Sequence, residues 1–386
     1  MRIVQLDPGG YTAHYDGNLC HELARRGHAV RLDTSRFLFE DVGPLGGYEV
    51  AYSFFRAIDP HGAFARWAAP RQLAKAVSYP VELVRWERAV CASPPDVVHL
   101  QWSLVPPLDL RVARRLRARG ARIVVTAHEL PWGNGVRSRS FTALCRSADA
   151  VVVHAAAAVD ELADRGVPSG RIRHMPMGGP GLYAGPSLAR ATARARLGLP
   201  ADGPLALFFG LVKGYKGLDV LLEALPLARE RVPGLRLLVA GRSLDPWGPY
   251  AARIERLGLG GAVVVRPDFV PTADVNAVFC AADVVVLPYR RAVQSGVVLA
   301  AWQFGRPVVA TRVGGVPELV EDGVTGFLAR PEDPVDLARA LVEAFSDEAR
   351  LAGIGTEVAA RAAGPHSWAA IAERHESVYE EALGAV

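Results

Sequence analysis

The residues whose types and spacing best suit chemistry lie between Ala281 and Glu318. This stretch holds two short apolar runs, Val284–Leu287 and Pro307–Ala310, which are rich in β-branched residues and bounded by Pro or Gly. Both runs are too short for helices, so they predict buried parallel strands. The apolar segment between them, residues 297–304, predicts a helix.

The start of that helix would follow the carboxyl end of a strand. Its unpaired N–H groups and the positive end of its dipole suit a phosphate or diphosphate. Gln294 or Ser295 can cap the first turn, and Gly296 lets the backbone come close to a ligand. We therefore expect Gln294, Ser295, Gly296 and Val297 to form an anion site. An ordinary strand–helix connection explains the stretch equally well.

Two loops in the first half of the chain also follow the carboxyl ends of predicted strands. His128 follows a strand predicted at residues 123–127 and precedes a loop rich in Gly, Pro and Trp, so it is well placed to face a cleft. Gly9 and Gly10 follow a strand predicted at residues 2–6, where the backbone donors of an α/β domain commonly meet a ligand. A structural histidine and a plain tight turn are the respective alternatives.

The elements that must position these residues alternate between strand and helix. In the first half, apolar runs predict further strands at residues 29–32, 97–100 and 151–154, and helical spacing predicts helices at residues 18–26 and 110–119. Residues 37–80 hold many aromatic residues without a clean period. We expect loops and a short helix there, forming a variable wall of a binding site.

The second half begins after Met177 to Pro186, a segment rich in Gly and Pro that suits an exposed linker. Strands predicted at residues 206–209, 235–240, 263–265, 284–287, 307–310 and 325–328 alternate with helices at residues 218–229, 297–304, 334–344 and 367–385. We therefore expect an α/β protein with two doubly wound, Rossmann-like domains facing a central cleft. The predicted domains are residues 1–178 and 179–366, followed by a C-terminal helix, residues 367–386.

Composition narrows the function classes. Half of the 386 residues are hydrophobic and the net charge is +4, which is too weak an excess to indicate nucleic acid but is compatible with anionic small molecules or an anionic membrane surface. Five arginines on the helix predicted at residues 110–119 suit anionic lipid headgroups or a phosphorylated acceptor, although a solvated helix face is the favoured explanation. The four cysteines show no metal-binding spacing, and no apolar run could span a membrane, so we expect a cytoplasmic protein, peripheral at most.

Several motifs resemble family 4 of the GT-B glycosyltransferases. The resemblance covers nearly the whole chain, is strong from residue 205 to residue 342 and is loose from residue 37 to residue 95. The matching segments are Gly9-Gly10, Arg26–Val30, Thr126–Glu129, Phe208–Gly210, Lys213–Leu221, Ser295–Val297, Gly305–Thr311, Gly314–Glu318 and Gly323–Leu328.

The resemblance implies a retaining transferase that moves a sugar from a nucleotide-diphosphate sugar to a hydroxyl acceptor without a bound metal or other cofactor. The N-terminal domain would bind a small-molecule, glycan or glycolipid acceptor, and the C-terminal domain would bind the nucleotide sugar. The final helix would cross back to the first domain. Peripheral membrane contact is compatible with this function, and the oligomeric state is left open.

The resemblance also implies roles for particular residues. Because a leaving diphosphate gains negative charge, cations must stabilise it, and Lys213 and Lys216 on one loop can do so. His128 would contact the sugar or orient the acceptor, and Gly9 and Gly10 would form an acceptor or phosphate loop. The remaining residues expected at the donor are Gly210, Arg266, Phe269, Gln294, Ser295, Gly296, Val297 and Glu318.

The chain departs from the family pattern at three positions. Two glutamates common in the family align with Ala292 and Ala300, and an arginine common after Gly210 is replaced by Leu211. The loss of the second glutamate removes a charge-assisted hydrogen bond to ribose hydroxyls. The departures fit an active subgroup, with Gln294 or Lys213 in substitute roles, and they also fit a catalytically silent binding subunit.

Overall fold

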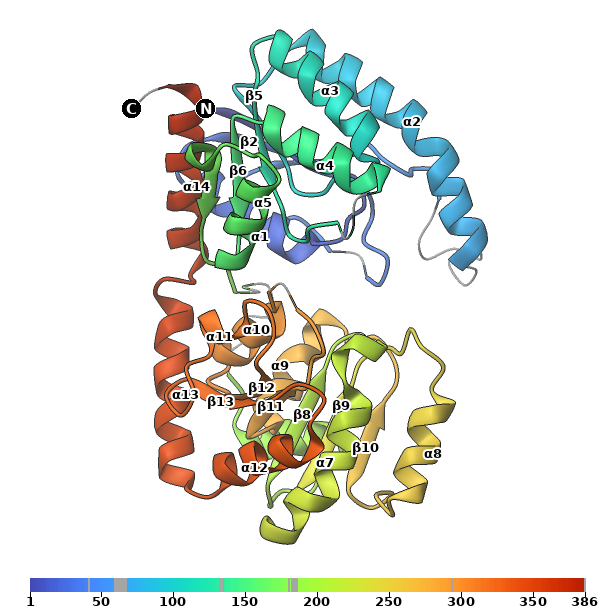
Figure 1. The fold of residues 1–386 in the computed structure, drawn as a ribbon, viewed down its shortest axis with the longest axis vertical. Coiled ribbons are helices and arrows are strands. Elements are labelled where there is room, and N and C mark those ends of the chain that lie inside the picture. Colours follow the sequence, from blue (N-terminus) through green and yellow to red (C-terminus); the bar gives the residue numbers. More distant parts are fainter. Residues whose placement is uncertain are drawn as a thin grey trace. The chain divides into compact units, whose positions relative to one another are not determined.

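A computed structural model describes residues 1–40, 42–58, 68–131, 133, 135–179, 181, 187–292 and 294–384. The chain divides into two compact units, Met1–Met177 together with Trp368–Val386, and Gly178–Ser367 (Figure 1). Of the linker expected at residues 177–186, residues 180 and 182–186 lie outside the described residues. The acceptor and donor roles expected of the two halves stay predictions.

The first unit is built on a parallel sheet of seven strands in the order β3-β2-β1-β4-β5-β6-β7. The chain runs outward from β1 to β3 and then returns to β4 on the other side of β1, so the strand order reverses between β1 and β4. Ligands of such sheets bind at this switch point, beyond the carboxyl ends of the strands. The strands are β1 (Arg2–Asp7), β2 (Ala29–Thr34), β3 (Glu49–Tyr52), β4 (Val97–Leu100), β5 (Arg122–Thr126), β6 (Ala150–Val153) and β7 (Ile172–His174).

Helices cover both faces of this sheet, because successive side chains of a strand point to opposite faces. Ile3 joins a buried cluster with residues of α1 and α14, whereas Leu6 packs with residues of α2 and α3. The helices of this unit are α1 (Ala13–Arg25), α2 (Ala68–Ala92), α3 (Pro106–Ala118), α4 (Val136–Ser147), α5 (Ala156–Asp164) and α14 (Trp368–Leu383).

The structure corrects the prediction for residues 37–80. Strand β3 and the first half of the 25-residue helix α2 lie there, in place of loops and a short helix. The buried side of α2 has helical spacing, with Tyr79, Leu83, Trp86 and Val90 in the core. An internal proline, Pro80, and several exposed apolar residues hide this period in the sequence. Likewise α1 begins five residues before the predicted start, and α4 was not predicted.

The second unit has a parallel sheet of six strands in the order β10-β9-β8-β11-β12-β13, with the switch point between β8 and β11. The two parallel sheets and their flanking helices confirm the predicted α/β fold class. The strands are β8 (Leu205–Phe209), β9 (Arg236–Ala240), β10 (Val263–Arg266), β11 (Val284–Leu287), β12 (Val308–Thr311) and β13 (Gly326–Ala329). The helices are α6 (Arg190–Arg196), α7 (Leu218–Arg231), α8 (Gly248–Arg256), α9 (Thr272–Ala281), α10 (Gly296–Gln303), α11 (Val316–Leu319), α12 (Pro334–Phe345) and α13 (Glu348–Ala363).

The central strands of this unit match the predictions closely. All four residues of β11 are buried, as expected for a strand covered on both faces. Helix α13 was not predicted, although Asp347 caps its first turn by accepting from the Arg350 N–H. Within the part of the chain that the structure describes, no helix is long and apolar enough to cross a membrane.

Candidate functional site

In the second unit, glycines allow close backbone contacts between the loops that follow the strands. Gly210 follows β8 with φ of +95°, and Gly241 follows β9 with φ of +142°. A Cβ on Gly241 would lie 2.2 Å from the Gly210 carbonyl oxygen, so no side chain fits there. Gly217 has φ of +69°, and its Cβ would lie 1.9 Å from the carbonyl oxygen of Pro288. The loops after β8, β9 and β11 therefore meet backbone to backbone.

Lys216 lies over the end of β8. It ends a short 3₁₀ turn, Gly214–Lys216, and its Nζ is 3.1 Å from the point that a Cβ on Gly210 would occupy. The same Nζ is 5.6 Å from the ring centroid of Tyr289. Burial, and secondarily the charge of Lys213, lowers the pKa of Lys216 to about 8. No acid among the described residues forms an ion pair with Lys213 or Lys216, although the Asp245 carboxylate accepts from the backbone N–H of Gly214, which lies between them in sequence.

Lysine is rare in this chain, and its use twice on this loop is a signal that sequence reasoning missed. The chain holds 44 lysines and arginines, and its three lysines are Lys75, Lys213 and Lys216. Two of the three therefore stand three residues apart on one loop, in a chain that uses arginine elsewhere. An ammonium is a compact charge whose pKa shifts readily on burial, which a guanidinium does not offer.

Arg290 is a residue of this site that sequence reasoning missed. It donates to both carboxylate oxygens of Asp219, at 2.9 and 2.8 Å, and to the carbonyl oxygen of Gly214, at 2.6 Å. Its backbone N–H donates to the Tyr215 carbonyl at 2.8 Å. Arg290 thus fastens the loop after β11 to the lysine loop. The available signal was a pair of arginines, Arg290 and Arg291, shortly after a buried strand.

The loop after β11 also leads into α10. This helix begins at Gly296, one residue before the predicted start, with Ser295 as the N-cap. The expected capping by Ser295 is wrong for the part of the chain that the structure describes, because this buried side chain makes no cap hydrogen bond. Gly296 is exposed, whereas Gln294 and Val297 are half-buried. The sheet topology therefore brings the lysine loop and the start of α10 to the same switch point.

The other expected donor residues are dispersed along the same sheet edge. Arg266 ends β10, and its guanidinium donates to the carbonyl oxygen of Leu197 at 2.5 Å. Phe269 is half-buried in the following loop, and Glu318 is exposed on α11. Their roles at a donor stay predictions.

The positions of the two missing glutamates differ in their surroundings. Ala292 is half-buried in the loop after β11. Ala300 is only 2% exposed and lies on α10 among other buried residues, including Trp302. A carboxylate at position 300 would therefore enter the core of the second unit.

In the first unit, Gly9 and Gly10 form a tight turn at the switch point between β1 and β4. Gly10 has φ of +60°, and a Cβ there would lie 2.9 Å from the Ser35 carbonyl oxygen. The Gly9 N–H donates to the Asp7 carboxylate at 3.1 Å, and the Gly10 N–H donates to the Asp7 carbonyl at 3.2 Å. Because both donors are occupied within the turn, the geometry favours the tight-turn alternative for these glycines. Their role as an acceptor or phosphate loop stays a prediction.

His128 follows β5, and its imidazole lies among the rings of other side chains. Its imidazole stacks on Trp102 with centroids 5.0 Å apart, and its Nε2 lies 3.1 Å from the amide oxygen of Gln101. Burial, with smaller effects from His154 and His375, holds the pKa of His128 well below its usual range. His128 is therefore neutral at neutral pH, and its role at the sugar or the acceptor stays a prediction.

A pocket of about 300 Å³ lies beside His128, at the carboxyl ends of β4 and β5 and at the start of α4. Glu129 and Arg137 bring charged groups to its wall. Arg137 is exposed and forms no ion pair with an acid in the described ranges. The pocket thus offers a neutral histidine and an open cation at the edge of the sheet where ligands commonly bind.

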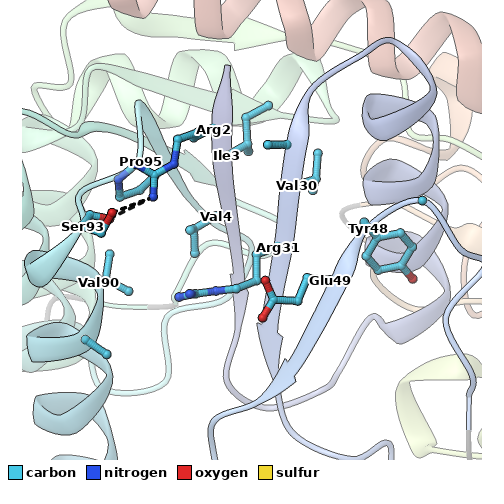
Figure 2. A pocket seen from close by; sticks show the side chains of 13 residues that line it. Arg2, Ile3, Val4, Val30, Arg31, Tyr48, Glu49, Val90, Ser93 and Pro95 are labelled. Atoms are coloured by element: carbon cyan, nitrogen blue, oxygen red, sulfur yellow. Dashed lines mark hydrogen bonds between the residues drawn. The ribbon is translucent and has the colours of Figure 1, made fainter.

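A second hollow, of about 510 Å³, lies at the opposite edge of the same sheet (Figure 2). It is lined by the beginnings of β1, β2 and β3 and by the end of α2. Its cations are engaged, since Arg2 donates to Ser93 and Arg31 pairs with Asp33. Because it lies at the amino ends of the strands, it is not part of the candidate site. Among the described residues, no group of His, Cys, Asp and Glu side chains is arranged to hold a metal ion.

Comparison with known proteins identifies the family. Residues 13–178 match the family model described as Glycosyltransferase Family 4, and residues 203–347 match the model described as Glycosyl transferases group 1. A D-inositol 3-phosphate glycosyltransferase of Streptomyces coelicolor is 36% identical over 249 residues, which are 61% of this chain and 53% of that protein. A second protein of that name, from Streptomyces avermitilis, is 38% identical over 208 residues, 52% of this chain and 44% of that protein. The chain spans about half the length of the curated relatives it matches.

Solved structures agree in fold. Sucrose-phosphate synthase from Thermosynechococcus elongatus is similar over 100% of both chains, with a TM-score of 0.73 and 22% identity. HepE of Anabaena, solved in complex with UDP-glucose, also has a TM-score of 0.73, at 21% identity over 100% of both chains. The fold is therefore that of the GT-B class. Within this class, the chain belongs to family 4 of the glycosyltransferases, which confirms the resemblance seen in the sequence.

Proposed function

We propose that the protein transfers a sugar from a nucleotide-diphosphate sugar to a hydroxyl acceptor, with retention of configuration and without a bound metal. One observation carries the proposal: Lys213 and Lys216 stand on one loop without an ion pair among the described residues, and Lys216 lies over Gly210, at the switch point from which α10 also starts. Membership of family 4 supports transferase activity, and the UDP-glucose complex of HepE supports a nucleotide-sugar donor.

The chemistry required of this site is charge stabilisation. As the bond between sugar and phosphate breaks, negative charge grows on the leaving diphosphate, and preorganised cations and N–H groups stabilise it. Lys216 is held in place by packing and by the clamp of Arg290 on its loop, so little reorganisation is needed during the reaction. The departing phosphate oxygen would then take the proton of the acceptor hydroxyl on the same face of the sugar.

We propose that the acceptor binds in the pocket beside His128. The relatives are named for an inositol phosphate acceptor, and a hydroxylated, anionic molecule would suit this pocket. Arg137 would pair with its anionic group, while Glu129 and the neutral imidazole of His128 would accept or donate hydrogen bonds to hydroxyls. The nucleotide base and the sugar remain to be found by screening, and the cytoplasmic localisation stays a prediction.

The test is a substitution of the two lysines. Lys216→Ala should lower kcat/KM by roughly 10²–10³, because one preorganised charge stabiliser is lost. Lys75→Ala is the matched control, since it removes the remaining lysine of the chain from a helix of the first unit. Turnover within about threefold of wild type in a Lys213→Ala, Lys216→Ala double variant would contradict the assignment of the donor site.

A catalytically silent binding subunit is the second candidate, and the absence of acids at Ala292 and Ala300 favours it. The two candidates differ in one measurement on the wild-type protein. The enzyme should release nucleoside diphosphate from a donor, whereas a silent subunit should show only a rise in melting temperature on binding it. The metal-independent mechanism predicts unchanged turnover in excess EDTA. A loss of turnover in EDTA that Mg²⁺ or Mn²⁺ restores would refute the proposal that the enzyme works without a metal.

A further inference from the structure

Helix α2 carries a row of exposed apolar side chains. Leu73, Val77 and Val81 are spaced four residues apart, which places them on one side of the helix, and they are 68%, 70% and 52% exposed. The core-facing side of the same helix is occupied by Tyr79 and Trp86, among others. Packing against the described residues does not explain large apolar side chains repeated on the solvent side of a helix.

The same helix belongs to a strongly basic layer. Helices α2, α3 and α4 lie side by side on one side of the first unit (Figure 1), and α2 is tied to α3 by the ion pair of Arg115 with Glu87. With Arg119, which directly follows α3, these helices hold twelve cations and three acids, of which Glu87 and Asp109 are buried. The layer thus has a formal charge of +9, whereas the whole chain has a net charge of +4.

Most of these cations are available to a partner. Eight of the arginines have no ion pair or side-chain hydrogen bond within the described part of the chain. They are Arg85, Arg88, Arg111, Arg114, Arg119, Arg137, Arg139 and Arg146. Two further exposed apolar residues, Val105 and Val136, stand at the starts of α3 and α4. We call the eight arginines with Leu73, Val77 and Val81 the basic face.

We propose that the basic face docks on an anionic lipid bilayer. The apolar row of α2 would enter the boundary between headgroups and acyl chains, and the flanking guanidinium groups would pair with lipid phosphates, to which their planar fork is matched. A solvated face explains the arginines but not Leu73, Val77 and Val81. A nucleic-acid surface would instead present aromatic side chains for stacking, and the row has none. The proposal does not depend on the transferase activity.

The experiment is flotation of the full chain with vesicles of phosphatidylglycerol and phosphatidylcholine in equal parts, and with vesicles of phosphatidylcholine alone. Wild type should float with the anionic vesicles and not with the neutral ones, and added NaCl should release it. Arg111→Gln with Arg114→Gln should weaken binding about fivefold for each arginine removed. Leu73→Ser with Val77→Ser and Val81→Ser should weaken it by about tenfold or more.

Matched controls come from the second unit. Val324→Ser with Val335→Ser removes two apolar side chains that are 43% and 69% exposed, and Arg196→Gln with Arg231→Gln removes two exposed arginines. Neither control should change vesicle binding. If the triple serine variant fails to fold, the arginine pair, whose side chains are exposed, carries the test alone.

Three outcomes would overturn the proposal. The first is absence of wild-type binding to anionic vesicles at low salt, and the second is equal binding by wild type and the variants of the basic face. The third is a dimer of wild type, seen by light scattering without lipid, that the triple serine variant abolishes, because the apolar row would then belong to a contact between copies of the chain.

Discussion

Lys216 illustrates how a surface loop can hold a residue with an altered pKa. Lys216 is half-buried, with its Nζ close to Gly210 and Tyr289, and no carboxylate forms an ion pair with it among the described residues. A buried ammonium without an acid partner loses hydration, so its neutral form becomes more accessible and its pKa falls to about 8. A bound diphosphate would reverse this shift, because it restores an opposite charge at the same place.

The pH dependence of turnover should report this residue. Protonated Lys216 is the form that stabilises the leaving group, so kcat/KM should fall as pH rises through about 8, where the free protein loses that proton. The corresponding fall in kcat should lie at higher pH, since the diphosphate raises the pKa in the complex. Profiles measured from about pH 6.5 to about pH 9.5 test this.

Lys216→Arg provides the decisive comparison. A guanidinium keeps its charge throughout this range, so the alkaline fall in kcat/KM should disappear, even if the maximal rate is lower. An unchanged alkaline fall in the arginine variant would assign the ionisation to another group.

At the scale of elements, the candidate donor site depends on loops that have no room for side chains. The loop after β8 touches the loops after β9 and β11 through Gly210, Gly241 and Gly217. Arg290 adds a polar clamp across the same loops. The lysine loop is therefore positioned by its neighbours rather than by its own conformational preference.

Gly217→Ala should disrupt this arrangement. The new methyl group would overlap the Pro288 carbonyl oxygen, 1.9 Å away, so the loops must separate. We expect a loss of unfolding free energy of about 3 kcal/mol or more and a matching loss of nucleoside-diphosphate affinity. Calorimetry and thermal shift would measure both.

Gly258→Ala is the matched control for that substitution. Gly258 has a similar φ of +65°, but nothing lies within 4 Å of its Cβ position. Its substitution should cost only the strain of the left-handed backbone, about 1 kcal/mol. Equal losses in the two variants would mean that the contact between the loops is unimportant.

At the scale of the whole molecule, the first unit is completed by residues far along the chain. The hydroxyl of Tyr379 on α14 accepts from the Gln5 side-chain amide at 2.8 Å and lies 2.8 Å from Nδ1 of His99. His375, also on α14, is fully buried, with its ring centroid 5.6 Å from that of His99. Burial lowers the pKa of His375 to about 4.

This burial makes His375 a source of acid sensitivity. The unfolded chain binds a proton at this residue near its ordinary pKa of 6.5, whereas the folded chain does so only near 4. Stability therefore falls as pH drops from about 6.5 to about 4, by about 2 kcal/mol between pH 7.5 and pH 5 for this residue.

The His375→Gln variant lacks this titration. Comparison with wild type should therefore show how much His375 contributes to the pH dependence of stability. The variant should be less stable than wild type at pH 7.5, because packing is disturbed, but the difference should narrow by about 2 kcal/mol at pH 5. Denaturant unfolding of both proteins at the two pH values gives the comparison. A constant difference would mean that His375 does not titrate on unfolding in this range.

The sequence by itself determined the alternation of strands and helices, the family and the loops on which candidate residues stand. The valines of β11, the glycines around Lys213 and Lys216, and the position of His128 after β5 all rest on short-range patterns. Such patterns survive in a single sequence because hydrophobic period and turn chemistry act within a few residues.

Only the tertiary structure decided what those residues contact. Long-range packing turned residues 68–92 into one helix despite Pro80, and it buried Ala300 in the core. It also placed Arg290 against Asp219 and Tyr379 against Gln5, across 71 and 374 residues of sequence. Partners so far apart leave no mark on local sequence patterns, because the free energy that pairs them arises only when the sheets assemble.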